Sequence, residues 1–190
     1  MPVTINGSGS IAGLSVGGRG SGVVNTATLA DGAASGSKLT MPTGSVIQTV
    51  SQTFDPYGDS GSDRGASTSY SDTGIVLSIT PTVSTSKILV MSEGGSFGYK
   101  TSDSQVDYYM RLVGTPSGGS LTEFREIEVR MTNMGNTTQR LFDSWNMSYL
   151  HDHNGTVAIE YKVQHKHGVA CTYCWARYRG ATMTLMEIAV

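Results

Sequence analysis

Residues that commonly bind metals gather in one stretch of this 190-residue chain. Residues 151 to 175, HDHNGTVAIEYKVQHKHGVACTYCW, hold all four histidines and both cysteines. Imidazole nitrogens and thiolates are the ligands that zinc and related transition metals take in proteins. In each His-x-His pair, one at His151 and His153 and one at His165 and His167, both rings would lie on one side of a strand. The stretch therefore has the residue types for a metal centre, provided that the fold brings them together.

Strand geometry separates the two histidine pairs. The sequence HNG at residues 153 to 155 predicts a hairpin turn in which Asp152 pairs with Thr156. In that register the apolar side chains share one face: Trp145, Met147 and Tyr149 opposite Val163, Tyr161 and Ile159. At about 3.3 Å per residue, the two pairs would lie roughly 27 Å apart along the strands. One chain could not build a four-histidine site.

One metal arrangement stays open for the histidines. On a threefold axis, three copies of His165 and His167 would offer six imidazoles, an octahedral set suited to a divalent transition metal. The alternative is that HKH and HDH are polar turn residues at two hairpin ends, with His165 bonded to Asp143 across the strand. The spacing is common and the chain adds no further signature. We therefore expect no metal and no other cofactor, and we keep His165 and His167 as intersubunit candidates.

Two further motifs suggest chemistry that their surroundings do not support. Cys171 and Cys174 in CTYC would point to opposite faces of a strand, and a zinc site of this kind needs a second pair of cysteines. The sequence GGSFG, Gly94 to Gly98, matches the G-x-S-x-G motif of esterases. That motif requires a strand, a sharp turn and a helix, whereas here the segment continues without a helical pattern.

Paired carboxylates for glycoside cleavage are available in one segment. Glu123, Glu126 and Glu128 lie close together in TEFREIEVR. The same segment is more simply interpreted as an exposed strand with alternating charge. We expect no catalytic residues and predict that the protein is not an enzyme.

The elements that would position these residues begin near residue 46. From there, nine short segments rich in Val, Ile, Thr and Tyr alternate with turn sequences, and no window has a capped helical pattern. The predicted strands span residues 46–50, 69–80, 86–95, 106–113, 124–132, 141–150, 156–164, 171–178 and 181–188. This pattern predicts an all-β head domain over residues 46–190, an antiparallel β-sandwich or jelly roll.

Residues 1–45 differ from the rest of the chain. They carry ten of the 24 glycines and only three charges, and the first of all the aromatic residues is Phe54. Such a segment buries too little apolar area to offset the entropy of its own ordering. Its apolar residues nevertheless alternate over residues 3–16, as in extended pieces that pair with other chains. We predict an extended Gly/Ser-rich attachment arm; the alternative is a flexible linker.

Charge and hydropathy exclude some partners. The 13 basic and 15 acidic residues form no concentrated positive field of the kind that binds a phosphate backbone, so we expect no nucleic-acid partner. No apolar run approaches the roughly 20 residues that span a bilayer, so we expect no membrane insertion. The N-terminus has no secretory pattern, which predicts synthesis in a cytoplasm.

Several strand motifs resemble a known module. The matching segments are Gly44 to Gln48, Tyr70 to Pro81, Thr85 to Val90 and Thr184 to Ile188, preceded by VVNTATLADGAASGSKL at residues 23–39. Together they resemble the C-terminal module of tail-fibre-like virion proteins of tailed bacteriophages, particularly phages of cyanobacteria. The resemblance runs from about residue 23 to the end of the chain, with a variable middle at residues 91–155.

The resemblance implies a virion structural protein made in the host bacterial cytoplasm. It implies a homotrimer whose arm docks to other virion proteins of tail or capsid and whose head projects outward. Small residues of three arms could pack about one axis, which agrees with a trimer. The chain lacks a long shaft, so a short tail fibre, an adaptor, and a head-fibre or capsid decoration protein all remain open.

The projecting head has two expected roles, attachment to a host surface glycan or stabilisation of the particle. Exposed aromatic side chains could stack on sugar rings, and the candidates are Tyr57, Tyr99, Tyr108 and Trp175. A free carbohydrate-binding module and a hydrolase acting on host polysaccharide are the alternatives. We rank both behind a structural role because of the arm and the missing catalytic set.

Overall fold

The chain divides into two compact units, Met1–Thr40 and Met41–Val190. The structure, a computed structural model, describes residues 4–5, 11–12, 41–54, 64–65, 67–100, 106–131, 139–168 and 175–190. In the first unit the described residues form β1 (Thr4–Ile5) and β2 (Ile11–Ala12), which pair antiparallel. The division falls five residues before the boundary predicted at 45/46.

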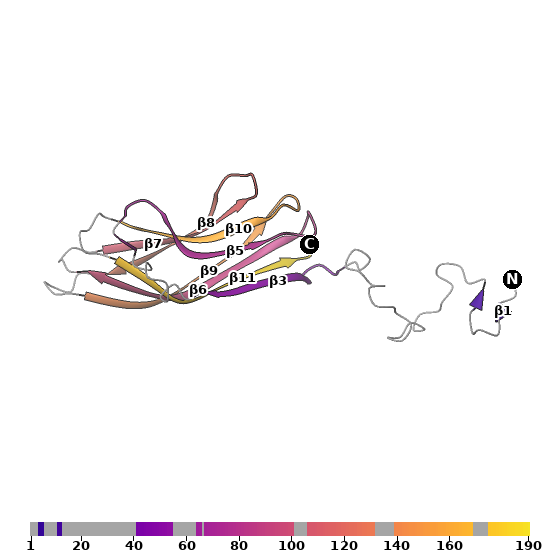
Figure 1. The fold of residues 1–190 in the computed structure, drawn as a ribbon, viewed down its shortest axis with the longest axis horizontal. Helices are drawn as coiled ribbons and strands as arrows, with labels where there is room; N and C mark the ends of the chain where they lie inside the picture. Colours follow the sequence, from indigo (N-terminus) through magenta and orange to yellow (C-terminus); the bar gives the residue numbers. More distant parts are fainter. Residues whose placement is uncertain are drawn as a thin grey trace. The chain divides into compact units, whose positions relative to one another are not determined.

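The second unit consists of two antiparallel sheets that face each other as two layers (Figure 1). One sheet has the order β3 (Val46–Phe54), β11 (Trp175–Ile188), β6 (Lys87–Lys100) and β9 (Gln139–Asp152), with the short β4 (Arg64–Gly65) also paired to β11. The other has the order β5 (Ser71–Ile79), β10 (Ile159–His167), β7 (Val106–Pro116) and β8 (Thr122–Met131). The predicted all-β sandwich is confirmed. No helix in the described part of the chain is long and apolar enough to cross a membrane.

Inward-facing and outward-facing side chains alternate along the strands, and the inward-facing ones form the core between the two sheets. β10 alternates buried and half-buried residues along its whole length, and β6, β7 and β11 alternate in the same way over much of theirs. The inward-facing apolar residues include Ile88, Val90, Met110, Leu112, Tyr161, Val163, Met183 and Leu185. Each such side chain contributes about 1.5–3 kcal/mol when fully buried. All the buried core residues that the structure describes therefore lie in the second unit.

The last two predicted strands are one strand. The turn expected at YRG, residues 178–180, is a bulge within β11, where the register shifts between Arg179 and Thr182 against β6. Gly180 has a φ of 53°, a conformation that glycine adopts without steric cost. A bulge of this kind bends and twists a strand without reversing it. The glycine therefore correctly indicated an irregular backbone position, but that position is a bulge and not the predicted turn.

The hairpin predicted across residues 152–156 is wrong. β9 pairs with β6 in one sheet, and β10 lies between β5 and β7 in the other, so the HNG segment crosses between the layers. The predicted apolar faces are nevertheless correct for most of their members: Trp145, Met147, Ile159, Tyr161 and Val163 are buried, while Tyr149 is exposed. Alternation specifies which face of a strand is buried, and either sheet of a sandwich satisfies it.

Candidate functional site

His165 and His167 lie on the inward face of β10 and are core residues. Their side chains are 0% and 2% exposed, and their ring centroids lie 5.9 Å apart at nearly a right angle. Burial lowers the pKa of His167, which favours the neutral ring. The expectation that HKH forms a polar turn is wrong, because the strand continues through it. β9, which carries Asp143, lies in the other sheet, so the two residues are not cross-strand neighbours.

The intersubunit metal site at His165 and His167 stays a prediction. In the single chain both rings face the interior of the sandwich, where a neighbouring copy has no direct approach. Within the described ranges, no three His, Cys, Asp or Glu side chains come together as a possible metal site. Cys171 and Cys174 lie outside the described residues.

His151 and His153 lie at the opposite end of the sandwich, where they join the two sheets. The Nδ1 atom of His151 is 2.7 Å from the hydroxyl of Tyr161 on β10, and its ring centroid is 4.6 Å from that of Phe124 on β8. Burial, and next the electrostatic effect of the neighbouring His153 ring, lower the pKa of His151, while Asp152 raises it. His151 therefore closes the edge of the sandwich between β8 and β9.

His153 uses both ring nitrogens within the protein. Its Nε2 atom lies 3.1 Å from the hydroxyl of Ser86, and its Nδ1 atom lies 2.9 Å from the carbonyl oxygen of Gly155. A metal ligand needs one free ring nitrogen. The HDH pair is thus structural: it holds the crossing between the layers to the loop between β5 and β6.

Glu187 is the acidic side chain most deeply engaged among the described residues. It is 0% exposed and accepts hydrogen bonds from the amides of Thr82 and Val83 at 3.0 and 2.9 Å. The Ser86 hydroxyl and the Gln48 amide nitrogen each donate to it at 2.6 Å. Burial opposes ionisation, but these hydrogen bonds outweigh it and lower the pKa of Glu187 to about 2.

The Glu187 carboxylate fixes the loop at residues 80–86 to the end of β11. Sequence reasoning missed it, although a signal was present in TLMEI. Alternation places Glu187 on the same face as Met183 and Leu185, so the pattern predicts an acidic side chain in the core. A buried carboxylate of this kind needs several donors nearby, and the hydroxyl-rich TPTVSTS loop supplies them.

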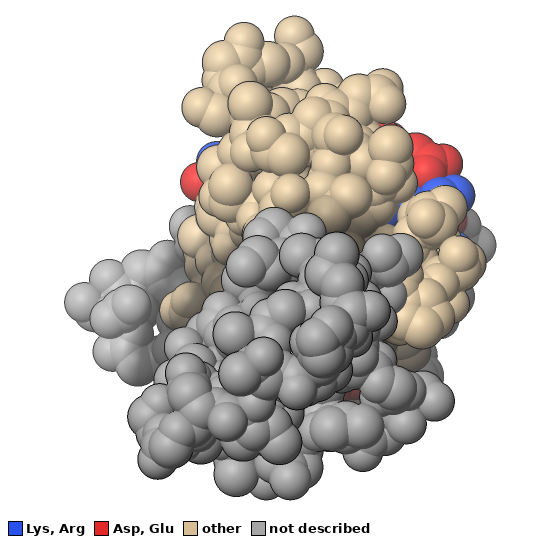
Figure 2. Space-filling view, turned by 90° about the vertical axis from the view of Figure 1, so that its right-hand side faces the viewer, with Lys and Arg blue, Asp and Glu red and all other residues tan. Residues whose placement is uncertain are grey.

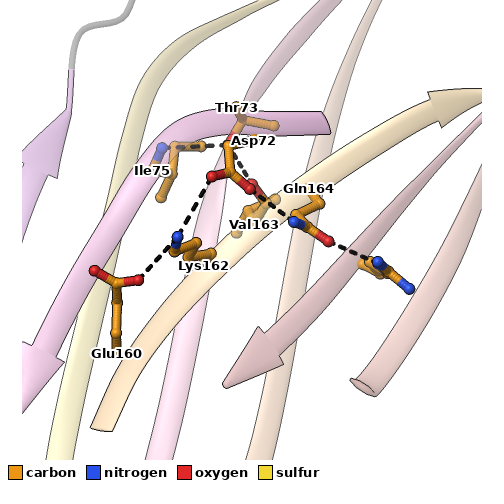
Figure 3. Close-up of polar contacts among 8 residues, drawn as sticks. Asp72, Thr73, Ile75, Glu160, Lys162, Val163 and Gln164 are labelled. Atoms are coloured by element: carbon orange, nitrogen blue, oxygen red, sulfur yellow. Dashed lines mark hydrogen bonds and ion pairs between the residues drawn. The ribbon is translucent and has the colours of Figure 1, made fainter. Parts of the chain in front are cut away.

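The outer face of the β5–β10–β7–β8 sheet carries a ladder of polar contacts (Figure 3). Lys162 lies between Glu160 and Asp72, at 2.8 and 3.4 Å, and Gln164 donates to Asp72 at 2.7 Å. Arg111 donates to Gln164 at 2.9 Å and so carries the ladder on to β7. These groups are partly exposed, and such pairs are worth little individually. Together they cross three strands and keep the face polar.

An aromatic ring lies over this ladder. The Arg111 guanidinium carbon is 3.7 Å from the ring centroid of Tyr70, and the Lys166 ammonium is 4.5 Å from it. The Tyr70 hydroxyl bonds to Glu126, and Arg111 also pairs with Glu123 at 2.7 Å. Two of the three β8 glutamates considered for glycoside cleavage are therefore bonded to side chains from other segments.

The aromatic residues chosen as sugar-stacking candidates have different positions. Tyr108 is 1% exposed and belongs to the core. Tyr99 and Trp175 are paired residues of β6 and β11, and Tyr57 lies outside the described residues. Sequence reasoning missed Tyr70, whose ring lies over the polar face. The signal for it was alternation in the strand predicted at residues 69–80, which places Tyr70 on the same face as Asp72.

The GGSFG segment is part of β6 and forms no turn. A Cβ atom on Gly94 would lie 2.9 Å from the Cβ of Ala181 and 3.0 Å from the Trp145 ring. Real Cβ atoms essentially never approach so closely. Gly94 therefore makes room for the Trp145 indole in the core, which is a packing role.

Comparisons with known proteins give no family. No family model and no curated protein matches the chain. Among solved structures, infectious bursal disease virus, Gt strain, has 13% identity and a TM-score of 0.34 over 75% of this chain and 32% of that one. The VP2 subviral particle of the same virus has 12% identity and a TM-score of 0.34, over 76% and 34% of the two chains.

Another similar structure is the CBM22-1 xylan-binding domain of Paenibacillus barcinonensis Xyn10C. It has 9% identity and a TM-score of 0.32, over 80% of this chain and 99% of that one. The chain spans about a third of the length of the viral chains that it matches. The structural neighbours are thus a viral capsid protein and a carbohydrate-binding module, at similarities too low to bear on function.

Proposed function

We propose that the chain is a structural protein of a bacteriophage virion, a short tail fibre or fibre-like component. Its arm docks to the particle, and its head projects for host attachment or assembly. The observation that carries the proposal is the division at residue 40/41 into a unit rich in glycine without aromatics and a unit with a complete core. A segment like the arm gains order from a partner, whereas the head needs none.

The chemistry of the head supports a structural role. Glu187, His151 and His153, the most deeply engaged titratable groups at their end of the sandwich, each bond to groups that hold loops or sheets together. The charged residues of the outer face pair with one another. In a catalytic site, convergent groups would instead point into a cavity.

The resemblance of the strand motifs to tail-fibre-like modules supports the particle as the partner and a homotrimer as the assembly. Tail and capsid positions are both compatible with it, so a capsid decoration or head-fibre protein is the nearest alternative. A host surface glycan is the expected ligand of a head that serves in attachment.

A carbohydrate-binding role is the second candidate, and one observation favours it. Tyr70, Gln164 and Glu123 lie on one open polar face, where ring, amide and carboxylate groups could meet a sugar. Binding of purified host glycan by the full chain, lost in Tyr70→Ala and kept in Thr49→Ala on the other sheet, would support this role.

Peptide mass spectrometry on gradient-purified phage particles tests the main proposal. We expect peptides of this chain at a fixed ratio to the capsid protein, and antibodies against the head that label intact particles in electron micrographs. Particles that contain no copy of the chain, while infected cells contain it abundantly, would contradict the proposal.

A further inference from the structure

One end of the head is formed by five segments that bond to one another. We call it the end face: residues 41–46, 80–86, 116–121, 153–158 and 188–190. Hydrogen bonds join Gly44 to Ala189 at 2.8 Å, Ser117 to Ala158 at 2.8 Å and Gly155 to Ser84 at 3.5 Å. This is the end at which the chain enters the head, because the second unit begins at Met41.

The end face has no charged side chain. None of its five segments contains Lys, Arg, Asp or Glu, whereas 15% of all residues in the chain are charged. The buried carboxylate of Glu187 lies beneath this surface, bonded to loop 80–86. At the surface, Lys87 and Asp152, the residues next to segments 80–86 and 153–158 in the chain, pair with each other at 3.0 Å. In Figure 2, which looks at this end, the tan surface of the described residues carries Lys, Arg, Asp and Glu along its sides.

The end face also carries most of the exposed apolar side chains. Eight large apolar residues are exposed in the described part of the chain, and six of them lie here: Met41, Val46, Val83, Leu121, Val157 and Val190. Uncharged, apolar surface costs little to remove from water, and contiguous surface of this kind marks interaction sites. Loops at the end of a sandwich are otherwise expected to be polar.

The end face is preorganised. The Glu187 carboxylate fixes loop 80–86 from below, through Thr82, Val83 and Ser86. The crossing at residues 153–158 is held by both nitrogens of His153. Surface loops that are already fixed lose little conformational entropy when they dock.

We infer that the end face docks against the end face of a second copy of this chain. Identical charged surfaces would repel each other, whereas identical uncharged surfaces meet without that cost. Each arm joins its head at the end face. Association of the arms of two copies would therefore raise the local concentration of one end face near the other. The inference rests on the self-association proposed above and assigns the surface that mediates it.

The shape of the end face suits such contact. A hollow of about 250 Å³ lies beside the crossing between the layers. Pro116, Asn154 and Val157 line it together with Asp152, whose carboxylate pairs with Lys87. Val83 is 43% exposed on the neighbouring loop and does not line that hollow. An exposed apolar side chain and a separate hollow on one surface allow the side chain of one copy to enter the hollow of the next, a heterologous contact that can close into a ring of copies.

Light scattering and sedimentation of the full chain test the inference. The test variant is the double change Val83→Asp and Val157→Asp, and the control is Leu150→Asp. The exposed fraction of Leu150 is 48%, close to the 50% of Val157. Leu150 points outward from β9 and is not part of the end face, so it is a matched control. Circular dichroism verifies that all three proteins are folded. We expect wild type and control to form the same oligomer, and the double variant to dissociate at least tenfold more readily.

An unchanged dissociation constant in the folded double variant would overturn the inference and leave self-association through the arm intact. A wild-type chain that stays monomeric at the highest attainable concentration would overturn it as well. Neither outcome decides whether the chain is in the virion, which mass spectrometry of particles tests separately.

Discussion

At the residue scale, the carboxylate of Glu187 couples stability to pH. Its pKa falls from 4.5 to about 2 on folding, which corresponds to roughly 3 kcal/mol of stability at neutral pH. Because the folded pKa is the lower one, this stability is present above pH 4.5 and is lost as pH falls toward 2. Urea denaturation at several pH values measures it.

Replacement of Glu187 tests its contribution to stability. We expect Glu187→Gln to cost about 2–4 kcal/mol at pH 7, because the side-chain NH₂ of Gln would face the amides of Thr82 and Val83. The same substitution should also remove most of the loss of stability on acidification. Glu160→Gln, at an exposed surface pair, should change stability by less than about 1 kcal/mol. An equal loss of stability on acidification in Glu187→Gln and wild type would refute this role.

His151 gives a second pH prediction. Burial lowers its pKa, so the neutral ring is favoured in the folded state and the unfolded chain takes up the proton first as pH falls. Its contribution to stability is therefore present above pH 6.5 and lost below it. In an NMR titration we expect the His151 ring to titrate below pH 6.5, and a midpoint above that value would contradict the burial that the structure gives it.

Residue positions could be predicted where alternation reaches them. In EYKVQHKH, His165 and His167 share parity with Tyr161 and Val163, so their inward direction was available from the sequence. A histidine is compatible with either face, and its polarity suggested a turn. The partners of Glu187 were not predictable, because they depend on contact between a loop and a strand about 100 residues apart in the chain.

At the element scale, Gly94 tests the packing of β6 against its neighbours. A Cβ atom there would meet Ala181 and Trp145 at 3.0 Å or less. We expect Gly94→Val to destabilise the head by about 1–3 kcal/mol through overpacking. Gly119→Ala in the β7–β8 turn, where the nearest atoms lie 3.3 Å away, should cost less. Thermal melts compare the two, and equal stabilities would show that the strands can part to admit a side chain.

Strand positions were predictable and strand partners were not. Period-2 alternation located the eight long strands of the head, since each buries one face. It did not reveal that β9 and β10 belong to different sheets, because both layers accept the same inward pattern. The YRG segment was misassigned for a related reason, since a glycine with positive φ serves a bulge as well as a turn.

At the scale of the whole molecule, the head should fold without the arm. Among the described residues, the fully buried apolar core lies between Ile75 and Leu185, Val50 and Phe54 pack against it, and the second unit begins at Met41. We expect a fragment of residues 41–190 to unfold cooperatively, within about 5 °C of the melting temperature of the full chain. Differential scanning calorimetry measures both. A fragment that melts without cooperativity would mean that the arm is part of the folded core.

The proposed function depends most on the arm as the attachment to the particle. The direct measurement compares tagged versions of the full chain and of residues 41–190, each expressed during infection by a phage that lacks the untagged protein. We predict that purified particles contain the full chain and exclude the folded 41–190 fragment. Equal incorporation of both versions would contradict the role of the arm, and absence of both would contradict a place in the virion.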